Sequence, residues 1–173
     1  TTSMPMTLTM EGSTGRAEKL PLLEFEICTG MMGDCVCAIV MYGHAPQGVF
    51  TQVRGFHGAG GIGNVNWQSL YQPVNAIAPV ANKTIVTFIL CGPNNSQHNA
   101  SLELAMYDAR RNSPLRTEFV IVHGLSSATL DRYGRLVDWI GKPQYMTVFG
   151  RHQFVTNLRN SPHPPPPGQS GHA

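Results

Sequence analysis

The chain has 173 residues, of which only 13% are charged, and its formal net charge is +2. This length favours one domain with a hydrophobic core of its own, and so small a net charge excludes a strong overall field for nucleic acid or membrane surfaces. The longest apolar runs, such as residues 85–91, are too short to cross a bilayer, which takes about 20 residues.

The low charge also leaves much of the surface uncharged, since soluble domains average about 25% charged residues. Such a surface fits a protein whose exterior is covered by neighbouring subunits. Gly- and Asn-rich loops on a monomer would produce it as well.

Apolar residues at alternate positions, bounded by Gly, Pro and Asn, predict β-strands along most of the chain. In residues 22–29, Leu23, Phe25 and Ile27 share one face and two glutamates occupy the other, which is typical of a half-buried strand. Residues 35–42 and 84–91 are apolar on both faces and predict central strands. In chain order, the predicted strands are 22–29, 35–42, 49–56, 84–91, 101–107, 117–123 and 145–155.

The segment 129–140 fits two local structures. Apolar residues recur with helical spacing from Leu130 to Ile140, whereas residues 131–134 (DRYG) resemble a hairpin turn that ends in glycine. We favour the hairpin. No other segment carries an extended helical pattern, so the alternation of strands and helices that marks a parallel doubly wound sheet is missing. The sequence therefore predicts an all-β, antiparallel sandwich with long loops.

Residues 161–173 are rich in proline, which has no N–H to donate and a fixed φ. They predict an extended polyproline II or disordered tail after a single domain of residues 1–160. An ordered tail of this kind has to lie against something, either a neighbouring subunit or its own domain. The candidate subunit-contact residues are Pro162, Pro164, Pro165, Pro166 and Pro167.

Residues 58–63 (GAGGIG) have the spacing G-x-G-x-x-G, which cradles a pyrophosphate in dinucleotide-binding proteins. That site also requires a helix beginning at the motif and an acidic residue about 20 positions further on. Residues 64–73 show no helical apolar period and end in proline, and no Asp or Glu occurs between Asp34 and Glu103. We interpret the motif as a flexible or bulged connection and not as a nucleotide site.

The residues that carry chemistry elsewhere form no recognisable catalytic or metal-binding pattern. The histidines lack H-x-x-x-H or H-x-H spacing, and residues 124–128 fail the G-x-S-x-G elbow at its last position. The cysteines Cys28, Cys35, Cys37 and Cys91 contain no C-x-x-C. Most lie in apolar runs, which favours buried free thiols over disulfides. A Cys–His nucleophile pair is left open, although apolar burial disfavours the thiolate. We expect no enzymatic activity, no cofactor and no metal.

Three N-glycosylation sequons begin at Asn82, Asn94 and Asn99. They carry weight only if the chain passes through the secretory pathway. They support a second hypothesis, in which the protein is a secreted or cell-surface jelly-roll or lectin-like binding module.

Basic residues are unevenly distributed. Between Arg110 and Arg159, eight basic residues stand against three acidic ones. This pattern fits either a mildly basic face or a solvated scatter of charges.

Residues 83–96 (KTIVTFILCGPNNS) are an apolar strand that runs into a Gly-Pro-Asn turn. This stretch resembles the corresponding strand and turn in the small coat subunits of picorna-like plant spherical viruses. The spacing of the predicted strands over residues 20–155 is similar to the eight-stranded jelly roll of those subunits. In size, the chain is most similar to the cheravirus type, which builds its shell from three separate small coat proteins.

The resemblance implies an eight-stranded antiparallel jelly roll cut from a polyprotein, which would explain a chain that begins at Thr1 without an initiator methionine. It further implies a non-enzymatic subunit that assembles with two sister coat proteins into an icosahedral, pseudo-T=3 shell around viral RNA. The expected location is the virion, and the host cytoplasm during assembly, with no membrane partner.

One feature departs from many spherical-virus coat proteins, which carry a basic N-terminal arm. Residues 1–15 contain no Lys or Arg. Contact with RNA would have to come from scattered arginines such as Arg110, Arg111 and Arg116, or from a sister subunit, because binding by counterion release needs several phosphate contacts.

Overall fold

The structure is a computed structural model of the chain. The described residues are 3–7, 13–16, 24–44, 50, 52–60, 64–76, 83–95, 109–112 and 117–149.

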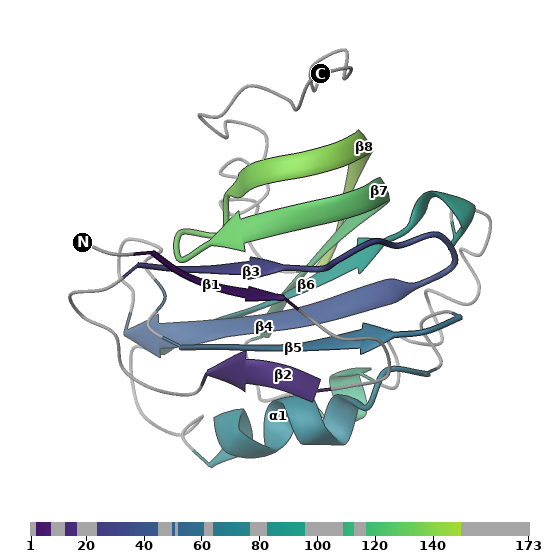
Figure 1. Ribbon diagram of the computed structural model, residues 1–173. Helices are drawn as coiled ribbons and strands as arrows, with labels where there is room; N and C mark the ends of the chain where they lie inside the picture. Colours follow the sequence, from purple (N-terminus) through teal and green to yellow (C-terminus); the bar gives the residue numbers. More distant parts are fainter. Residues whose placement is uncertain are drawn as a thin grey trace.

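Strands dominate the described chain, which confirms the predicted all-β class (Figure 1). The elements in chain order are β1 (Ser3–Thr7), β2 (Ser13–Arg16), β3 (Glu24–Cys28), β4 (Val36–His44), β5 (Gln52–Gly58), α1 (Trp67–Asn75), β6 (Lys83–Cys91), the 3-10 turn η2 (Pro93–Asn95), β7 (Thr117–Asp131) and β8 (Leu136–Phe149).

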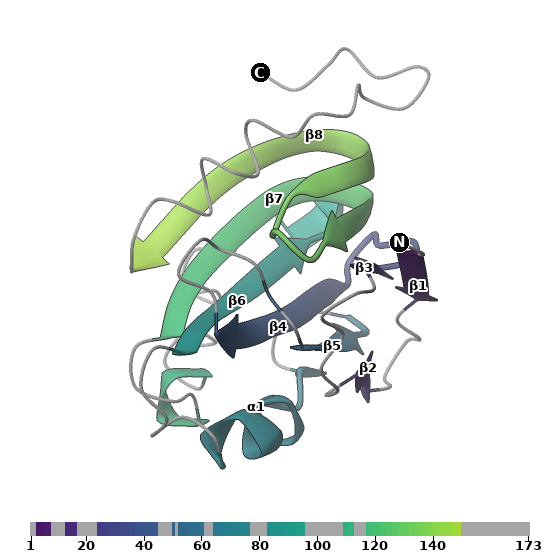
Figure 2. The same ribbon diagram turned by 90° about the vertical axis from the view of Figure 1, so that its left-hand side faces the viewer.

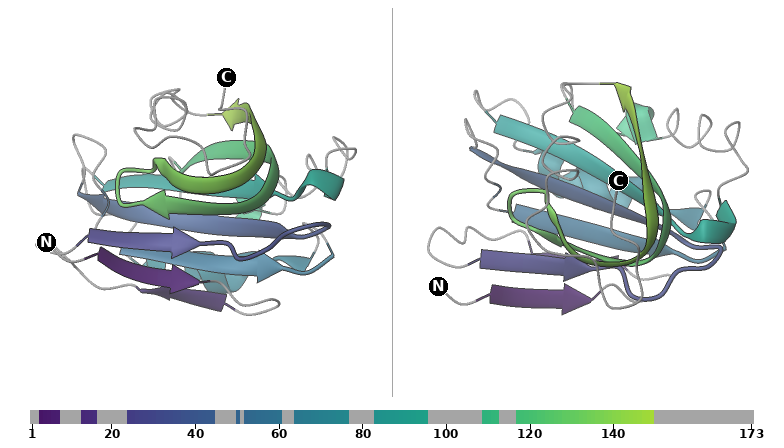
Figure 3. Two further views of the ribbon diagram at one scale, coloured as in Figure 1. Left: turned by 45° about the horizontal axis from the view of Figure 1, so that its top comes forward. Right: turned by 90° about the horizontal axis from the view of Figure 1, so that it is seen from above.

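All of the described strands belong to one sheet with the order β1-β3-β7-β6-β4-β5-β2, and β8 pairs with β7 outside this path. β7 is long enough to serve several neighbours. Its first half pairs with β6, its last residues pair with β3, and β8 pairs along most of its length. Figures 2 and 3 show that the sheet curls strongly, so that the β7–β8 hairpin arches over the remaining strands.

The prediction of a purely antiparallel sheet is wrong at two places. β6 runs parallel to β7, and β1 runs parallel to β3. Parallel neighbours need a crossover of about a dozen residues or more, and the connections over 92–116 and 8–23 have that length. Alternation of apolar residues reports which face is buried but carries no information on strand direction.

β4 and β6 form the centre of the sheet, as predicted from their two apolar faces. β4 pairs with β5 on one edge and with β6 on the other, in the register Ile39↔Phe88. Its residues are buried from Val36 to Gly43. Both central-strand predictions are confirmed.

Two hydrophobic clusters lie on the two faces of this centre. The inner core fills the curl, because it joins Ile27 of β3, Val53 of β5 and Trp139 of β8, which lie far apart in the strand order. The helix-side core lies on the opposite face, where α1 covers the sheet. The helix-side core consists of Val36, Ala38, Val40, Tyr42, Phe56, Val65, Trp67, Leu70, Tyr71, Val74, Ile85, Ile89, Cys91, Ala109, Phe119 and Ile121.

The sequence analysis did not predict the helix α1. Its conclusion that residues 64–73 have no helical apolar period is wrong. Trp67, Leu70, Tyr71 and Val74 are all buried and recur at i, i+3, i+4 and i+7, which is the spacing of one helix face. The side chain of Asn66 caps the helix by accepting a hydrogen bond from the Ser69 N–H at 3.1 Å. This short pattern was missed because a proline lies in the last turn, and proline disfavours helix.

A hydrogen bond fixes α1 to the centre of the sheet. The Tyr71 hydroxyl lies 2.7 Å from Thr87 Oγ1 of β6, and both residues are fully buried. Because the two hydroxyls satisfy each other, neither is left unpaired in the core.

The hairpin predicted over 129–140 is confirmed. β7 ends at Asp131 and β8 begins at Leu136, with Gly134 in the turn at φ 73°.

Further from the turn, β7 and β8 bend at a glycine corner formed by Gly124 and Gly141. A Cβ on Gly124 would lie 2.4 Å from the Lys142 carbonyl oxygen, and one on Gly141 would lie 2.1 Å from the Gly124 oxygen. Only glycine fits at either position, and the register shifts there as in a bulge.

The remaining strand predictions are met to different extents. The strands predicted at 22–29, 49–56 and 117–123 correspond to β3, β5 and the first half of β7. The strand predicted at 145–155 overlaps β8, which begins earlier, and residues 150–155 lie outside the described part. The strand predicted at 101–107 and the tail 161–173 also lie outside it, and β1 and β2 were not predicted.

Candidate functional site

Side chains capable of chemistry gather at three places among the described residues. These are a buried group around Thr29, the tip of the β7–β8 hairpin, and a helical turn at residues 109–112. Each is built by a different part of the fold.

The buried group brings a thiol and an imidazole together. Cys37 of β4 and His57 of β5 are directly opposite each other in the antiparallel ladder. His57 Nδ1 lies 2.8 Å from the Thr29 carbonyl oxygen, and Cys37 Sγ donates to the same oxygen at 3.8 Å. Because a carbonyl oxygen only accepts, Nδ1 carries a hydrogen. Nε2 has no partner among the described residues.

The two side chains bond the same carbonyl oxygen instead of each other, and their surroundings disfavour a role as nucleophile and base. Burial raises the pKa of Cys37, and the nearby thiols of Cys35, Cys28 and Cys91 raise it further. Cys37 is 0% and His57 3% exposed, so a substrate has no access and the thiolate is disfavoured.

The Thr29 group is instead a structural junction. Thr29 is fully buried, and its N–H donates to the Ala128 oxygen of β7 at 2.9 Å. Its hydroxyl donates to the Gly30 oxygen at 2.6 Å and accepts from the Ala128 N–H at 3.1 Å. One residue therefore ties the loop after β3 to β4, β5 and β7.

All four cysteines are free, which confirms the preference for thiols over disulfides. Cys35, Cys37 and Cys91 are buried and Cys28 is half-buried. Burial raises the pKa of the Cys91 thiol to about 12. The thiols of Cys37 and Cys91 are therefore protonated and behave as small apolar groups.

No cluster of three or more His, Cys, Asp or Glu side chains suited to a metal ion occurs within the described residues. Two of the described histidines, His57 and His123, are buried. Burial lowers the pKa of His123, which holds its imidazole in the neutral form near neutral pH. His98, His152, His163 and His172 lie outside the described part.

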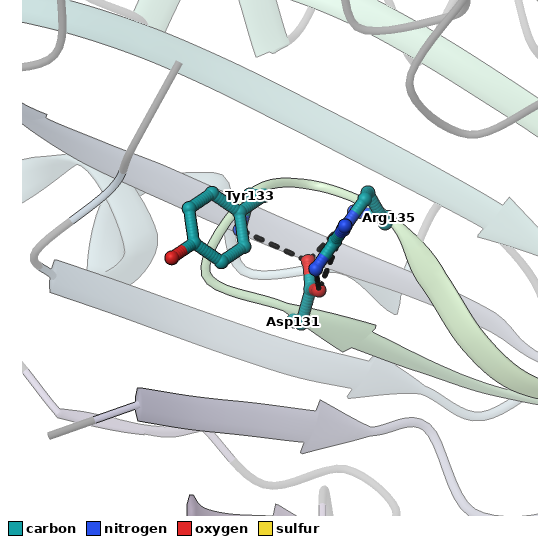
Figure 4. Close-up of polar contacts among 3 residues, drawn as sticks. All are labelled: Asp131, Tyr133 and Arg135. Carbon is teal, nitrogen blue, oxygen red and sulfur yellow. Dashed lines mark hydrogen bonds and ion pairs between the residues drawn. The ribbon is translucent and has the colours of Figure 1, made fainter. Parts of the chain in front are cut away.

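The hairpin tip is the most elaborate polar arrangement, and Figure 4 shows its three main residues. Asp131 Oδ1 accepts the N–H groups of Tyr133 and Arg135 at 2.9 and 3.0 Å. Asp131 Oδ2 pairs with Arg135 Nε at 2.9 Å and with the second guanidinium nitrogen at 2.8 Å. The guanidinium carbons of Arg135 and Arg132 lie 4.7 and 5.8 Å from the Tyr133 ring centre.

This arrangement holds the turn closed. The carboxylate occupies the centre of the turn, and the Phe50 N–H donates to the Arg132 oxygen at 2.8 Å, which attaches the tip to the segment before β5. The turn was predicted from the sequence, but the carboxylate and the i, i+4 ion pair of Asp131 with Arg135 were missed. Their spacing was the available signal.

The predicted basic contacts are only partly described. Residues 109–112 are helical, with Ala109 buried in the helix-side core and Arg110 and Arg111 exposed. The Asn75 side chain at the end of α1 donates to the Asn112 oxygen at 3.0 Å, which positions this turn beside the helix. Arg116 and the prolines Pro162, Pro164, Pro165, Pro166 and Pro167 lie outside the described residues.

The glycine motif at 58–63 has more of its expected context than the sequence predicted. A strand, β5, precedes it and a helix, α1, follows it. However, α1 begins at Trp67, beyond the last glycine, and Asn66 already occupies the Ser69 N–H. The strands that flank α1 are not neighbours, because β4 lies between β5 and β6. Residues 61–63 are outside the described part.

Among the described helices, none is long and apolar enough to cross a membrane. The sequon residue Asn94 is exposed in η2, whereas Asn82 and Asn99 are outside the described part. Comparison with known proteins returned no matching family model, no matching curated protein and no matching solved structure.

Proposed function

We propose that this protein is a structural coat subunit of a picorna-like plant spherical virus of the cheravirus type. In this proposal, it assembles with two sister coat proteins into an icosahedral, pseudo-T=3 shell around viral RNA. Its role is to form part of the shell, and it has no catalytic role, cofactor or metal.

The observation that carries the proposal is the resemblance over residues 83–96, the strand and Gly-Pro-Asn turn of β6 and η2. β6 is central to the sheet, and its apolar residues belong to both cores. The described polar groups support the same idea, because Thr29, Cys37, His57 and Asp131 are buried and serve internal contacts.

The proposal includes the eight-stranded jelly roll that the resemblance implies. That jelly roll is antiparallel throughout, whereas in this structure β6 pairs parallel with β7 and β1 pairs parallel with β3. The coat-subunit function does not depend on that topology, because a curled sheet with either kind of strand pairing can form a wedge in a shell.

Electron microscopy of native material tests the proposal, together with a gel that identifies the co-purifying chains. A closed shell containing RNA and two further coat-sized chains is the expected result. We also expect the isolated chain to associate or aggregate, since obligate interfaces bury about 2,000 Å² or more. A well-behaved monomer in its native source would overturn the proposal.

The alternative is a secreted or cell-surface jelly-roll or lectin-like module with glycans near Asn82, Asn94 and Asn99. The exposed position of Asn94 in η2 favours it, because a glycan there would have room. Mass spectrometry of native material separates the two functions. Unmodified asparagine at all three sequons would count against the alternative.

A further inference from the structure

β5 carries one Lys or Arg side chain, Arg54, and this side chain is half-buried. Its Nε atom is buried and has no hydrogen-bond partner among the described residues. β5, its neighbours β2 and β4, and α1 contain no Asp or Glu, and none occurs in the chain between Asp34 and Glu103. A guanidinium held partly out of water without a counter-charge is unfavourable. A negative group brought to this position from another molecule would therefore be bound favourably.

The strand register places two further hydrogen-bonding side chains beside Arg54. Tyr42 of β4 is directly opposite Gln52, and Val40 is directly opposite Arg54. Opposite residues, and residues two apart on a strand, share one face. Val40 and Tyr42 belong to the helix-side core, so Gln52 and Arg54 lie on that face as well. Across the other edge of β5, Arg54 is opposite Gly15 of β2, which has no side chain to lie over it (Figure 1).

Tyr42 adds a buried hydroxyl to this group. The residue is fully buried, and its hydroxyl oxygen has no hydrogen-bond partner among the described residues. Burial raises the pKa of the hydroxyl and the charge of Arg54 acts in the opposite direction, which places the guanidinium near it. The hydroxyl is therefore protonated at neutral pH and able to donate. The buried Tyr71 hydroxyl of the same core differs, because Thr87 satisfies it.

We propose that Arg54, Gln52 and Tyr42 form a binding site for a single carboxylate of another molecule. The guanidinium offers parallel N–H groups that match the two oxygens of a carboxylate, and it neutralises the negative charge. The Gln52 amide and the Tyr42 hydroxyl supply further donors. Gln52 and Arg54 are half-buried and Tyr42 is fully buried. The ligand therefore meets the amide and the guanidinium first, and the hydroxyl is the innermost donor.

The surrounding residues favour a carboxylate over a phosphate of RNA. Stable contact with an RNA backbone needs several basic residues, whereas Arg54 is the only Lys or Arg on β4, β5 and α1. The exposed residues of α1, which covers the same face of the sheet, are all amides, namely Gln68, Gln72 and Asn75. One cation among neutral donors balances the charge of one carboxylate.

This site goes beyond the coat-subunit function and does not require it. In a shell, the carboxylate would belong to an Asp or Glu of a neighbouring subunit. In a protein with another function, it would belong to a partner protein or to a small organic acid.

Thermal unfolding of the full chain, with acetate as the probe, is the first test. In about 100 mM sodium acetate, the wild-type unfolding midpoint should lie about 3–5 °C above its value in sodium chloride of equal ionic strength, which corresponds to acetate about tenfold above its dissociation constant. Arg54→Gln should abolish this rise. The matched control Lys142→Gln, which removes an exposed base of β8, should keep it.

Three results of this test would overturn the site. One is no rise in the wild type, which is expected if the end of Arg54 simply reaches water. Another is an equal rise in the wild type and in Arg54→Gln, because it would be a general salt effect. The third is a rise that depends on Arg54 but is larger in inorganic phosphate than in acetate.

Two tyrosine variants separate a binding role from a structural one. In chloride, Tyr71→Phe should lower the unfolding midpoint, because it leaves the Thr87 hydroxyl unpaired in the core. Tyr42→Phe should not lower it, since the hydroxyl that it removes has no described partner. In acetate, Tyr42→Phe should lose about half of the acetate-specific rise, the share of one hydrogen bond, and Tyr71→Phe should keep it. Equal losses in chloride, or a full acetate rise in Tyr42→Phe, would exclude Tyr42 from the site.

Arg54→Lys identifies the source of the carboxylate. This variant keeps the charge and supplies an amine, which a carbodiimide couples as an amide to a carboxylate in contact with it. In material from the native source, mass spectrometry should find position 54 joined to an Asp or Glu of another chain or to a small organic acid. Either product would support the site. Coupling at Lys142 without any coupling at position 54 would overturn it.

The site and the coat-subunit function can fail separately. An RNA-containing shell whose subunits show no acetate effect that depends on Arg54 would overturn the site and leave the coat function standing. An effect that depends on Arg54 in a native monomer would support the site and count against the coat function.

Discussion

The central strands and the β7–β8 hairpin are stabilised in different ways. β4 and β6 are paired on both edges, buried on both faces and almost entirely apolar. The hairpin has a glycine corner and a turn organised around one carboxylate, and among the described strands β8 pairs only with β7. α1 and the hairpin lie at opposite ends of the molecule (Figures 1 and 2).

This difference concerns what each region demands of the sequence. The centre needs apolar residues of suitable volume, and several choices would satisfy it. The hairpin needs particular residues at particular positions, because only glycine fits at Gly124 and Gly141 and the turn needs the acceptor oxygens of Asp131. Hydrophobicity therefore specifies the first region and local backbone geometry specifies the second.

The largest effect is expected in the centre. Phe88 is fully buried in the inner core, and Phe88→Ala should lower the free energy of unfolding by about 3–5 kcal/mol, because it removes apolar contacts and leaves a cavity. The matched change on the hairpin, Ile140→Ala at a position that is 42% exposed, should cost about 0.5 kcal/mol or less. Urea unfolding below the concentration at which the chain associates would measure both. Similar losses would contradict the contrast between the regions.

The glycine corner should be the most sensitive position of the hairpin. Gly141 has φ 121°, and a Cβ there would lie 2.1 Å from the Gly124 oxygen. Gly141→Ala combines a strained backbone with a clash and should cost about 3 kcal/mol. Gly33→Ala is the control, since its Cβ would only touch the Asn94 side chain at 3.6 Å. An unchanged urea midpoint for Gly141→Ala would show that the corner can relax.

The turn should depend on the oxygens of Asp131 more than on its charge. Asp131→Ala removes the acceptor of two backbone N–H groups and of Arg135, and should cost about 2 kcal/mol. Asp131→Asn keeps one carbonyl oxygen and loses the ion pair with a partly exposed arginine, so it should cost about 1 kcal/mol or less. Thermal unfolding of both variants would test this order, and equal losses would mean that the charge dominates.

The same contrast explains what could be predicted from the sequence. The strands β3, β4, β5 and β6 and the hairpin turn follow from apolar alternation, continuous apolar runs and turn residues, which are local signals. Strand direction does not, because the parallel pairing of β6 with β7 depends on a long connection. α1 was missed because Trp67, Leu70, Tyr71 and Val74 span only two turns, with a proline inside them.

Contacts between distant residues were equally beyond the sequence. Cys37 and His57 are 20 positions apart and meet only because β4 and β5 pair in one register. A shift of that register by one residue would separate their side chains onto opposite faces. The two glycines of the corner are likewise recognisable only once β7 and β8 are aligned.

His123 lies at the junction of the two regions, directly before Gly124 and opposite Gln144 of β8. Burial lowers the pKa of its imidazole in the folded chain, whereas the unfolded chain has the ordinary value of about 6.5. Below that pH the unfolded chain binds a proton that the folded chain takes up only at lower pH, so stability falls as the pH falls. We expect the wild-type chain to lose more stability between pH 7 and pH 5 than His123→Gln. Taking the difference between the two chains removes the contribution of the other titrating groups. Parallel pH profiles would mean that the imidazole at this junction reaches solvent when it is protonated, and the hairpin would then be more loosely joined to the centre than its burial indicates.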